Sequence, residues 1–443
     1  MSGRHGLRFT LAIALLSAAL LPAAAAGAGE ARAGVTMGGD LRLSGSGAIG
    51  DDWRPAVAYS ETSGVFLVVR EDERDPFWRG SDIYGRRVGA DGKATGPDIR
   101  ISGKGASEND QGPAVAWNKT NDEFLVVWAD YRQEADYGSE IWGQRVHANG
   151  SLAGANFRIS SGVTDQLNPA VAWNQTKNEY LVVWEDHRNG GFNGDDIYGR
   201  RVAADGTVVD AKDFLISEHE APGTDQQSYE KFPDVAWNST LHDYLVVWQD
   251  TEAGSGRGWE IYGRMVTGEG ALDGGEFRIC GLAATSHEQW PAVAYSKANN
   301  SYLVVWMDWR NLAERGWDLY ARKVSSGGNP TGPEVRLSGT AATADEVVPD
   351  VAWGATSGLY LVVWDDSRDS VAESSDTWGQ WVNGLGEAVG SNFRISGNAA
   401  AGTEWTPAVA WGKNINKFLV VRPDARDAAT AKKVDIFGRL VFG

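Results

Sequence analysis

The chain contains very little cysteine, histidine or methionine for its length. Among 443 residues there are one cysteine, six histidines and four methionines. A single cysteine excludes an internal disulfide and any metal site built from several thiolates. Cys280 stands where the other repeats described below carry serine. We therefore interpret it as a small structural residue, with a reactive thiol as the alternative.

A long hydrophobic run occurs only at the start of the chain. Residues 1–33 resemble a signal peptide, with Arg4 and Arg8 before an apolar stretch and small residues near positions 26 and 33 where cleavage is expected. The apolar stretch, Phe9 to Leu21, has 13 residues. A membrane-spanning helix needs about 20. We therefore expect a secreted, extracellular protein with no membrane insertion, whose residues 34–443 form one domain.

Positive charge is also scarce. Lys and Arg number 41 against 59 Asp and Glu, which gives a net charge of −18, and loss of Arg4 and Arg8 with the signal peptide makes it −20. Such an excess of negative charge argues against nucleic acid, anionic membranes and anionic glycans as partners. Acidic loops such as Asp51–Asp52 and Asp195–Asp196 leave Ca²⁺ open as a ligand, although no DxDxDG pattern is present.

Recognisable catalytic motifs are absent from the sequence. It has no serine-hydrolase elbow, no phosphate-binding glycine loop, no CxxC pair, no HExxH and no EF-hand loop. The motifs therefore predict no catalytic residue, no metal ligand and no cofactor.

What the chain does have is a segment that returns seven times. Each copy begins at a proline followed by an Ala-Val-Ala-Trp-like run, and the spacings are 58, 56, 64, 58, 58 and 58 residues. The prolines are Pro55, Pro113, Pro169, Pro233, Pro291, Pro349 and Pro407. In the second copy, four runs rich in β-branched and aromatic residues are Ala114–Trp117, Phe124–Trp128, Ile141–Val146 and Phe157–Ser160. Four strands at this period predict the blades of a β-propeller.

The two ends of the chain complement each other. The seventh copy stops after Asp435–Arg439 and lacks a fourth strand, whereas Asp40–Ser44 matches the fourth strand of the sixth copy, Asn392–Ser396. The N-terminal strand should therefore complete the last blade, because closure removes two open sheet edges. We predict an all-β, seven-bladed β-propeller with four antiparallel strands in each blade.

Each second strand ends in an aspartate, and six of the seven have an arginine two residues later. Another acid follows the aspartate after ten or eleven residues. This pattern favours a hydrogen-bonded charge cluster that holds each loop, with seven equivalent ligand sites as the alternative. Arg70 and Arg422 replace a repeated tryptophan in the first and last copies, which become neighbours when the ring closes. Either a cationic groove or a local repair of this junction, which we call the seam, accounts for them.

Across residues 41–443 the chain resembles exported bacterial propeller-repeat proteins. The resemblance is carried by the runs Leu181–Arg188 (LVVWEDHR) and Asp196–Arg200 (DIYGR). The marks of WD40 repeats and the Asp box of sialidases are absent. The resemblance implies the fold and export, and no specific activity.

Candidate binding residues are aromatic side chains that do not follow the sevenfold pattern. They fall in the longer loops, between second and third strands and between fourth and first strands, which share one face that we call the top face. Rigid exposed aromatic rings suit sugar stacking or protein contacts, and covering the core is the alternative. The candidates are Trp53, Trp78, Tyr137, Phe192, Trp259, Trp290, Trp309, Trp317 and Trp405.

One interval of the repeat is longer than the others. Ile216 to Pro233 spans 17 residues where most copies have 12, and the segment contains His219 and Tyr229. Together with His187, these residues could provide a general acid and base, and an inert insertion is the alternative.

These observations lead to a ranked expectation about function. We expect a non-catalytic, lectin-like carbohydrate-binding protein, monomeric, that uses the top face and has an extracellular glycan or surface protein as its partner. The alternatives are an enzyme acting on polysaccharide, a lyase or hydrolase with its site near the loop between the third and fourth blades, and an extracellular protein-interaction scaffold.

Overall fold

The chain divides into two units, residues 1–34 and residues 35–443, and only the second is described. The predicted signal peptide lies outside the described residues. The computed structural model describes residues 35–45, 50–74, 80–103, 109–132, 138–162, 164–189, 194–217, 228–251, 258–281, 287–311, 316–339, 344–368, 375–397, 406–426 and 434–442. Within these ranges there is no helix with the length and apolar character needed to cross a membrane.

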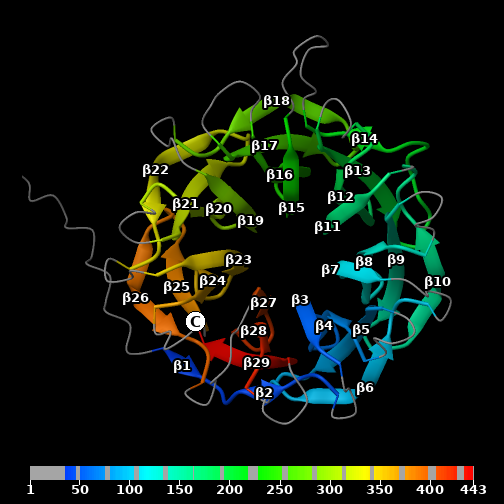
Figure 1. Cartoon of the computed structure of the whole chain (residues 1–443), viewed down its shortest axis with the longest axis horizontal. Coiled ribbons are helices and arrows are strands. Elements are labelled where there is room, and N and C mark those ends of the chain that lie inside the picture. Colours follow the sequence, from blue (N-terminus) through cyan, green and yellow to red (C-terminus); the bar gives the residue numbers. More distant parts are fainter. Residues whose placement is uncertain are drawn as a thin grey trace, which may run out of the picture. The chain divides into compact units, whose positions relative to one another are not determined.

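Residues 35–443 form a seven-bladed β-propeller, as predicted. The strands of each blade pair antiparallel, and in the first six blades they run outward from the central channel in chain order (Figure 1). The innermost strands are β3 (Asp52–Ser60), β7 (Asp110–Asn118), β11 (Gln166–Asn174), β15 (Glu230–Asn238), β19 (Glu288–Ser296), β23 (Glu346–Gly354) and β27 (Ala408–Gly412). The second strands are β4 (Val65–Asp72), β8 (Glu123–Asp130), β12 (Glu179–Asp186), β16 (Asp243–Asp250), β20 (Ser301–Asp308), β24 (Leu359–Asp366) and β28 (Lys417–Asp424).

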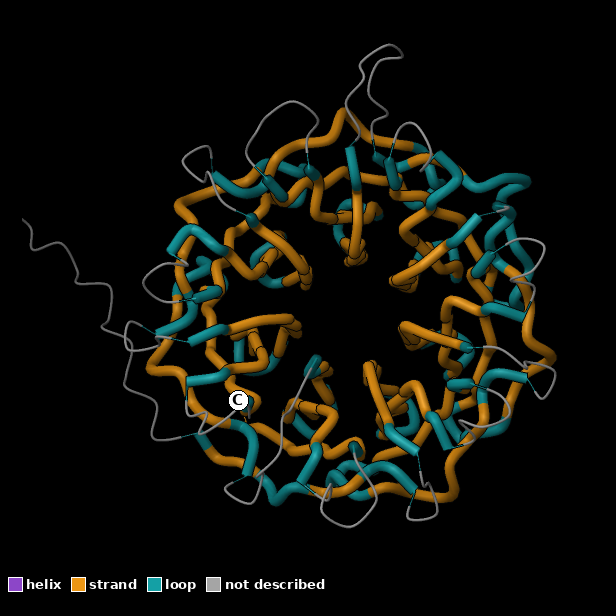
Figure 2. The backbone as a smooth tube through the Cα atoms, in the orientation of Figure 1, coloured by secondary structure: helices purple, strands orange, loops and turns teal. Residues whose placement is uncertain are grey.

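The outer half of each blade has the same order. The third strands are β5 (Asp82–Val88), β9 (Glu140–His147), β13 (Asp196–Ala203), β17 (Glu260–Thr267), β21 (Asp318–Ser325), β25 (Asp376–Asn383) and β29 (Asp435–Phe442). The outer strands are β6 (Ala94–Arg100), β10 (Leu152–Arg158), β14 (Phe214–Leu215), β18 (Leu272–Arg278), β22 (Pro330–Arg336) and β26 (Ala388–Arg394). Blades are numbered one to seven in this order, and Figure 2 shows strands and loops alternating around the ring.

The N-terminal segment closes the ring. β1 (Thr36–Met37) and β2 (Leu41–Arg42) both pair antiparallel with β29, so they supply the outer strand of blade seven. Leu41 lies opposite Gly438, as the match between the chain ends predicts. Figure 1 shows β1 and β2 beside β29 at the meeting point of the two ends.

The core lies between neighbouring blades. The second strands are almost wholly buried, because both of their faces meet another blade. Trp128 of blade two, for example, packs with Leu67 and Val69 of blade one. Repeated aromatic and branched residues therefore have a structural role as the packing layer of the ring.

In six of the seven blades, the repeated aspartate and arginine form the predicted tie at the end of the second strand. In blade three, Asp186 is buried and accepts hydrogen bonds from Trp184 Nε1 at 3.0 Å and from the backbone N–H of Arg188 at 2.9 Å. The Arg188 guanidinium lies 3.9 Å from the ring centre of Tyr198. The following acid takes a different partner from the predicted one, because in blade one Asp82 pairs with Arg100 of the outer strand.

Arg70 and Arg422 belong to the packing of the seam, and the alternative prediction of a cationic groove is wrong. Both side chains are buried, at 1% and 0% exposure. Arg70 lies 2.9 Å from Asp52 and 3.0 Å from Asp98, and Arg422 lies 2.9 Å from Asp40. Each arginine thus replaces a buried tryptophan with a paired charge beside the junction of the two chain ends.

Cys280 takes the structural place of a serine. In blade one, Ser102 Oγ accepts the backbone N–H of Ile83 at 3.0 Å, and Cys280 Sγ accepts that of Ile261 at 3.3 Å. Burial, with the nearby Glu288 charge, raises the pKa of Cys280 to about 12, so the thiol stays protonated.

Candidate functional site

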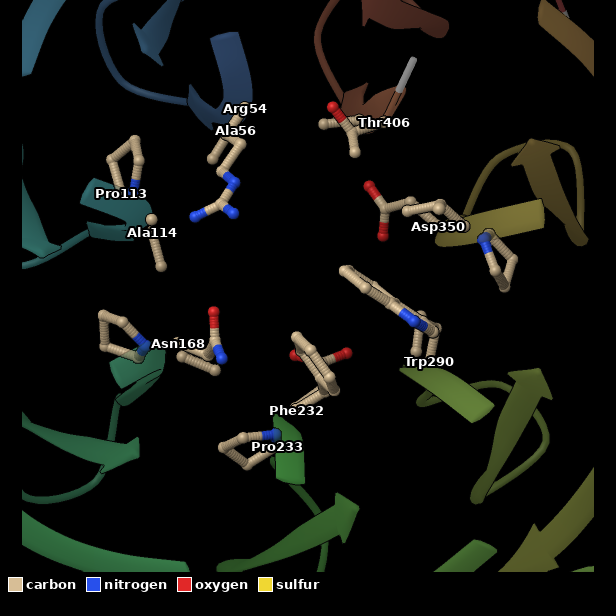
Figure 3. A pocket seen from close by; sticks show the side chains of 18 of the residues that line it. Arg54, Ala56, Pro113, Ala114, Asn168, Phe232, Pro233, Trp290, Asp350 and Thr406 are labelled. Atoms are coloured by element: carbon tan, nitrogen blue, oxygen red, sulfur yellow. The ribbon is translucent and has the colours of Figure 1, made fainter. Parts of the chain in front are cut away.

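The central channel opens on the top face into a cavity of about 300 Å³. Every blade contributes the start of its innermost strand to the wall: one variable residue, the repeated proline and the residue that follows it. Figure 3 looks into this cavity and shows side chains from around the channel directed toward its middle. We call the seven variable residues the mouth ring: Arg54, Gly112, Asn168, Phe232, Trp290, Val348 and Thr406.

The backbone places these side chains in the same way in every blade. All seven mouth-ring residues have a positive φ, between 36° and 60°. In six blades, the pairing of the first and second strands also shifts register at this point, as at a β-bulge. A positive φ is costly for a residue with a Cβ, most of all for a branched one such as Val348. The fold therefore keeps a strained geometry at the position that faces the channel.

Three mouth-ring residues are held from behind by the residue that precedes the repeated aspartate at the end of a second strand. Glu71 Oε1 accepts the backbone N–H of Gly112 at 2.6 Å, and Gln249 Oε1 accepts that of Trp290 at 3.0 Å. Glu185 Oε2 accepts from the side chain of Asn168 at 3.0 Å. This supporting position also differs between blades, so the sevenfold repetition fails around the whole channel mouth.

An aromatic platform lies on one side of the cavity. The rings of Phe232 and Trp290, from blades four and five, have centroids 4.1 Å apart and an interplanar angle of 23°. Figure 3 shows both rings reaching into the cavity. Flat apolar faces of this kind suit stacking against a sugar ring.

A basic group faces the platform. The Arg54 guanidinium points into the cavity from blade one (Figure 3), and its side chain is 49% exposed. Its Nη1 atom lies 3.4 Å from Glu71 Oε1, and the same oxygen accepts the shorter hydrogen bond from Gly112. Arg54 therefore retains donors for a ligand in the cavity.

Two carboxyl groups line the same cavity. Asp234 accepts the backbone N–H groups of Val235 at 2.8 Å and of Val293, in the next blade, at 2.7 Å. Asp350 does the same with Val351 and Val409, both at 2.7 Å. Burial raises the pKa of Asp234 to about 6, against the effect of these hydrogen bonds. Burial likewise raises the pKa of Asp350 to about 7, and the charge of Asp234 adds to that rise.

A charged cluster borders the mouth between blades three and four. His187 Nε2 lies 2.8 Å from Glu185 Oε1, and this hydrogen bond, opposed by burial, raises the pKa of His187. Lys231 Nζ lies 2.9 Å from Glu185 and 2.7 Å from Asp195. Burial favours the neutral form of Glu185, but the hydrogen bonds from His187 and Lys231 prevail and lower the pKa of its carboxyl group.

Glu185, His187 and Asp195 bring ligand-type atoms within 4.8 Å of one another, as a metal site would require. The Lys231 ammonium already bridges the two carboxylates of this group. A divalent cation would have to displace that buried charge pairing, so the residues present fit an internal ion cluster better than a metal site.

The aromatic candidates named from the sequence fall into three groups. Trp290 is in the mouth ring. Trp309 and Trp317 stack on each other at 5.5 Å beside His287, while Trp53 and Trp259 are half-buried near the top-face loops. Trp78, Tyr137, Phe192 and Trp405 lie outside the described residues, as does His219. Tyr229 lies near Lys231, with 6.0 Å between its ring centre and Nζ.

Sequence reasoning missed most of the mouth ring. The residue before each repeated proline has no chemistry in common across the seven copies, so the repeat pattern did not single it out. The missed signal is that this residue differs in all seven copies while its neighbours repeat. Asp234 and Asp350 carried a similar signal, because five of the seven copies have alanine at that position.

Comparison with known proteins gives matches at the level of structure. No protein-family model matches the chain, and no curated protein sequence matches it. A protein of unknown function from Dyadobacter fermentans superposes with a TM-score of 0.53 at 9% identity, covering 92% of this chain and 99% of that one. The GH93 α-L-arabinofuranosidase of Fusarium graminearum, in complex with arabinobiose, gives a TM-score of 0.50 at 10% identity, covering 91% and 97%. Identities this low establish a shared fold.

The comparison corrects the first expectation about function. A non-catalytic, lectin-like protein was expected, but the GH93 neighbour, which has a stated activity, is a carbohydrate-cleaving enzyme. A second structure of this α-L-arabinofuranosidase, with an iminosugar inhibitor, has a TM-score of 0.50 at 12% identity. The main interpretation is therefore wrong, and an enzyme acting on polysaccharide remains as a hypothesis.

Proposed function

We propose that this protein is a secreted glycoside hydrolase whose active site is the channel mouth. One observation carries the proposal: two carboxyl groups with pKa values near neutrality line the same cavity as a stacked aromatic platform. Glycoside hydrolysis typically uses a pair of carboxyl groups, one protonated and one ionised. The site thus lies on the channel axis, and the third and fourth blades form one side of it through Asn168, Phe232 and Asp234.

The two carboxyl groups have different roles in this proposal. Asp350 keeps its proton up to about pH 7 and donates it to the glycosidic oxygen as the bond to the sugar carbon breaks. Asp234 ionises first, stabilises the positive charge that develops on the sugar ring, and takes a proton from the water molecule whose oxygen bonds to that sugar carbon. Each carboxyl oxygen accepts one backbone N–H, which leaves a further lone pair on each for a proton or a substrate hydroxyl.

The rest of the mouth binds the substrate. A sugar ring stacks on Phe232 and Trp290, and Arg54 donates hydrogen bonds to hydroxyl oxygens on the other side. A cavity of about 300 Å³ admits a small number of sugar units, so we propose a chain end or a short oligosaccharide as the substrate. The arabinobiose bound to the GH93 neighbour makes arabinan and arabino-oligosaccharides the first substrates to try.

The test is an activity screen of the secreted protein. We expect it to release reducing ends from arabino-oligosaccharides or from another member of a broad polysaccharide panel. Asp350→Asn should lower the rate by about 100-fold or more, because a general acid contributes at least that much. The rate should follow a bell-shaped pH profile with limits near 6 and 7, and Asp350→Asn should remove the alkaline limit.

Asp205→Asn is the matched control, since Asp205 lies in the turn after β13, away from the cavity. Its activity should equal that of the parent protein. No release from any substrate, or equal activity of the Asp350→Asn and Asp205→Asn variants, would reject the proposed site. Formation of an unsaturated product would replace hydrolysis with a lyase reaction.

A further inference from the structure

A second cavity, independent of the channel, lies on the outer part of the ring between blades one and two. It has a volume of about 400 Å³, and its wall includes Gly103, Arg132, Gln144 and Asn156. Four other blades show which group normally lies beside the loop arginine at the equivalent position.

In those four blades, a carboxylate of the outer strand contacts the loop arginine of the tie. In blade seven this carboxylate comes from the N-terminal segment. The oxygen–nitrogen distances are 2.9 Å for Asp98 and Arg74, 2.8 Å for Asp213 and Arg188, 2.8 Å for Glu334 and Arg310, and 3.0 Å for Asp40 and Arg426.

Three of these carboxylates also accept a backbone N–H from the end of the preceding blade. The Ser161 N–H donates to Asp213 at 3.0 Å, and the Gly397 N–H donates to Asp40 at 3.1 Å. The Gly281 N–H donates to Glu334. An arginine and a backbone N–H on opposite sides form a cradle for one carboxylate, and charge-assisted hydrogen bonds of this kind are the stronger ones.

Blade two keeps the donors of this cradle and lacks the carboxylate. Arg132 is the loop arginine, and Gly103 is the counterpart of Ser161, Gly281 and Gly397. Asn156 stands where the acid would be, and its amide group donates to Gln144 Oε1 at 2.7 Å and to the Ile101 carbonyl at 2.9 Å. Among the described residues, Arg132 has one acid in ion-pair contact, Asp130.

Blade six carries the same pair of amides, Gln380 and Asn392. Its loop arginine, Arg368, has a second acid within reach, since Glu346 lies 3.8 Å away. The cavity lined by Arg132 lies at blade two, where the ion pair of the loop arginine is with Asp130.

We propose that this cavity binds a carboxylate-bearing sugar, a uronic acid, whose carboxylate lies beside the Asn156 amide and gives Arg132 the second negative partner that Asp98, Asp213, Glu334 and Asp40 provide elsewhere. The carboxylate accepts hydrogen bonds from the Arg132 guanidinium, and the remaining volume accommodates the sugar ring. The net charge of the protein disfavours long polyanions, whereas a single carboxylate responds mainly to the nearby donors, because distant charges are screened.

The test compares D-glucuronate with D-glucose, which differ by the carboxylate, using ligand-observed NMR and calorimetry on the secreted protein. We expect glucuronate to bind at least tenfold more tightly than glucose. The double variant Gln144→Arg with Asn156→Asp transfers the blade-three arrangement of Arg200 and Asp213 into blade two. It supplies an internal carboxylate, so it should fold normally and bind glucuronate at least tenfold more weakly.

A reverse variant tests the same geometry elsewhere. Arg200→Gln with Asp213→Asn converts blade three to the blade-two arrangement, and we expect it to raise the number of glucuronate sites by one. Unchanged glucuronate binding in the blade-two double variant, equal binding of glucose, or no binding would overturn the proposal. Acetate binding as tightly as glucuronate would overturn the assignment to sugars. The channel residues are untouched in these variants, so the result is independent of the proposed hydrolase activity.

Discussion

The end of the second strand and the start of the innermost strand are paired neighbours, yet their residues show opposite patterns across the seven copies. At the strand end, an aspartate recurs in all seven copies and an arginine follows it in six. At the mouth ring, seven different residues occupy seven equivalent positions. The first pattern is expected when every blade must solve the same packing problem. The second is expected when one asymmetric ligand contacts each blade differently, so divergence within the repeat marks the site better than residue type does.

The largest expected effect on stability comes from Asp40, which pairs with the arginines of blade seven at the seam. Asp40 lies 2.9 Å from Arg422, 3.0 Å from Arg426 and 2.9 Å from Arg439. Asp40→Asn leaves the buried Arg422 short of negative charge, and loss of one partner from a buried pair costs about 3–5 kcal/mol. Urea unfolding should show a loss of that size.

Asp98→Asn is the matched control, because Asp98 lies at 3.0 Å, 2.9 Å and 3.1 Å from Arg70, Arg74 and Arg86. Both variants should be destabilised, but only Asp40→Asn should speed hydrogen exchange in β2 and β29, whose pairing closes the ring. Equal exchange in the two variants would mean that Asp40 has no special role in closure.

The next largest effect distinguishes the stabilising role of the tie from the binding role proposed for the mouth ring. Asp186→Asn removes the charge facing Arg188 and places an amide near Trp184 Nε1, so we expect a loss of about 2 kcal/mol. Trp290→Ala should change the free energy of unfolding by less than about 1 kcal/mol while it abolishes most substrate turnover, because the ring faces a cavity. The comparison fails if Trp290→Ala is the more destabilising of the two.

A pH effect of intermediate size comes from carboxyl pairs buried beside the tie. Glu346 lies opposite Asp366 in the strand pairing, and burial, with that charge, raises its pKa to about 8. An unfolded glutamate titrates near 4.3. Since the folded state holds this proton more tightly, the stabilisation is complete below about pH 4.3 and is lost as the pH rises to about 8.

Blade three provides the natural test, because Gln166 lies opposite Asp186 there. Glu346→Gln should gain at least about 1 kcal/mol of stability relative to the parent as the pH rises from 5 to 8. Melting temperatures across this range measure the difference. Parallel pH profiles for the two proteins would contradict the assignment of the proton to Glu346.

The ring and the tie were predictable because their patterns recur in all or six of the seven blades, and the closure was predictable because the two chain ends match the strands of a complete blade. It placed the first strand of blade two at Ala114–Trp117, whereas β7 begins at Asp110. The reason is local: Gly112–Pro113 looks like a strand breaker, but the positive φ of Gly112 is a bulge inside the strand. The sequence pattern therefore assigns residues in bulges to loops, and for this reason it did not identify the mouth-ring residues as one set.

The side chains of the candidate site were harder to predict for a second reason. Which groups meet across the channel depends on the closed ring, since Arg54, Phe232 and Trp290 are far apart in the chain. Trp290 was found because aromatic residues stand out in any loop. Asp234 and Asp350 look like ordinary acids until the fold places them in the channel wall, where burial raises their pKa values.

The smallest expected effect tests whether the strained backbone at the mouth ring is retained because its side chains contact the substrate. Val348 has a φ of 51°, and a branched residue there costs about 1 kcal/mol or more relative to asparagine or glycine. Val348→Asn, which copies Asn168, should therefore raise the free energy of unfolding by about 1 kcal/mol. Gly112→Val, the reverse change at the equivalent position, should lower it by a similar amount. If Val348→Asn is instead destabilising, valine is held there by packing, and the variation around the ring reflects stability. If the protein gains stability and loses turnover, the strain is retained because the Val348 side chain faces the substrate.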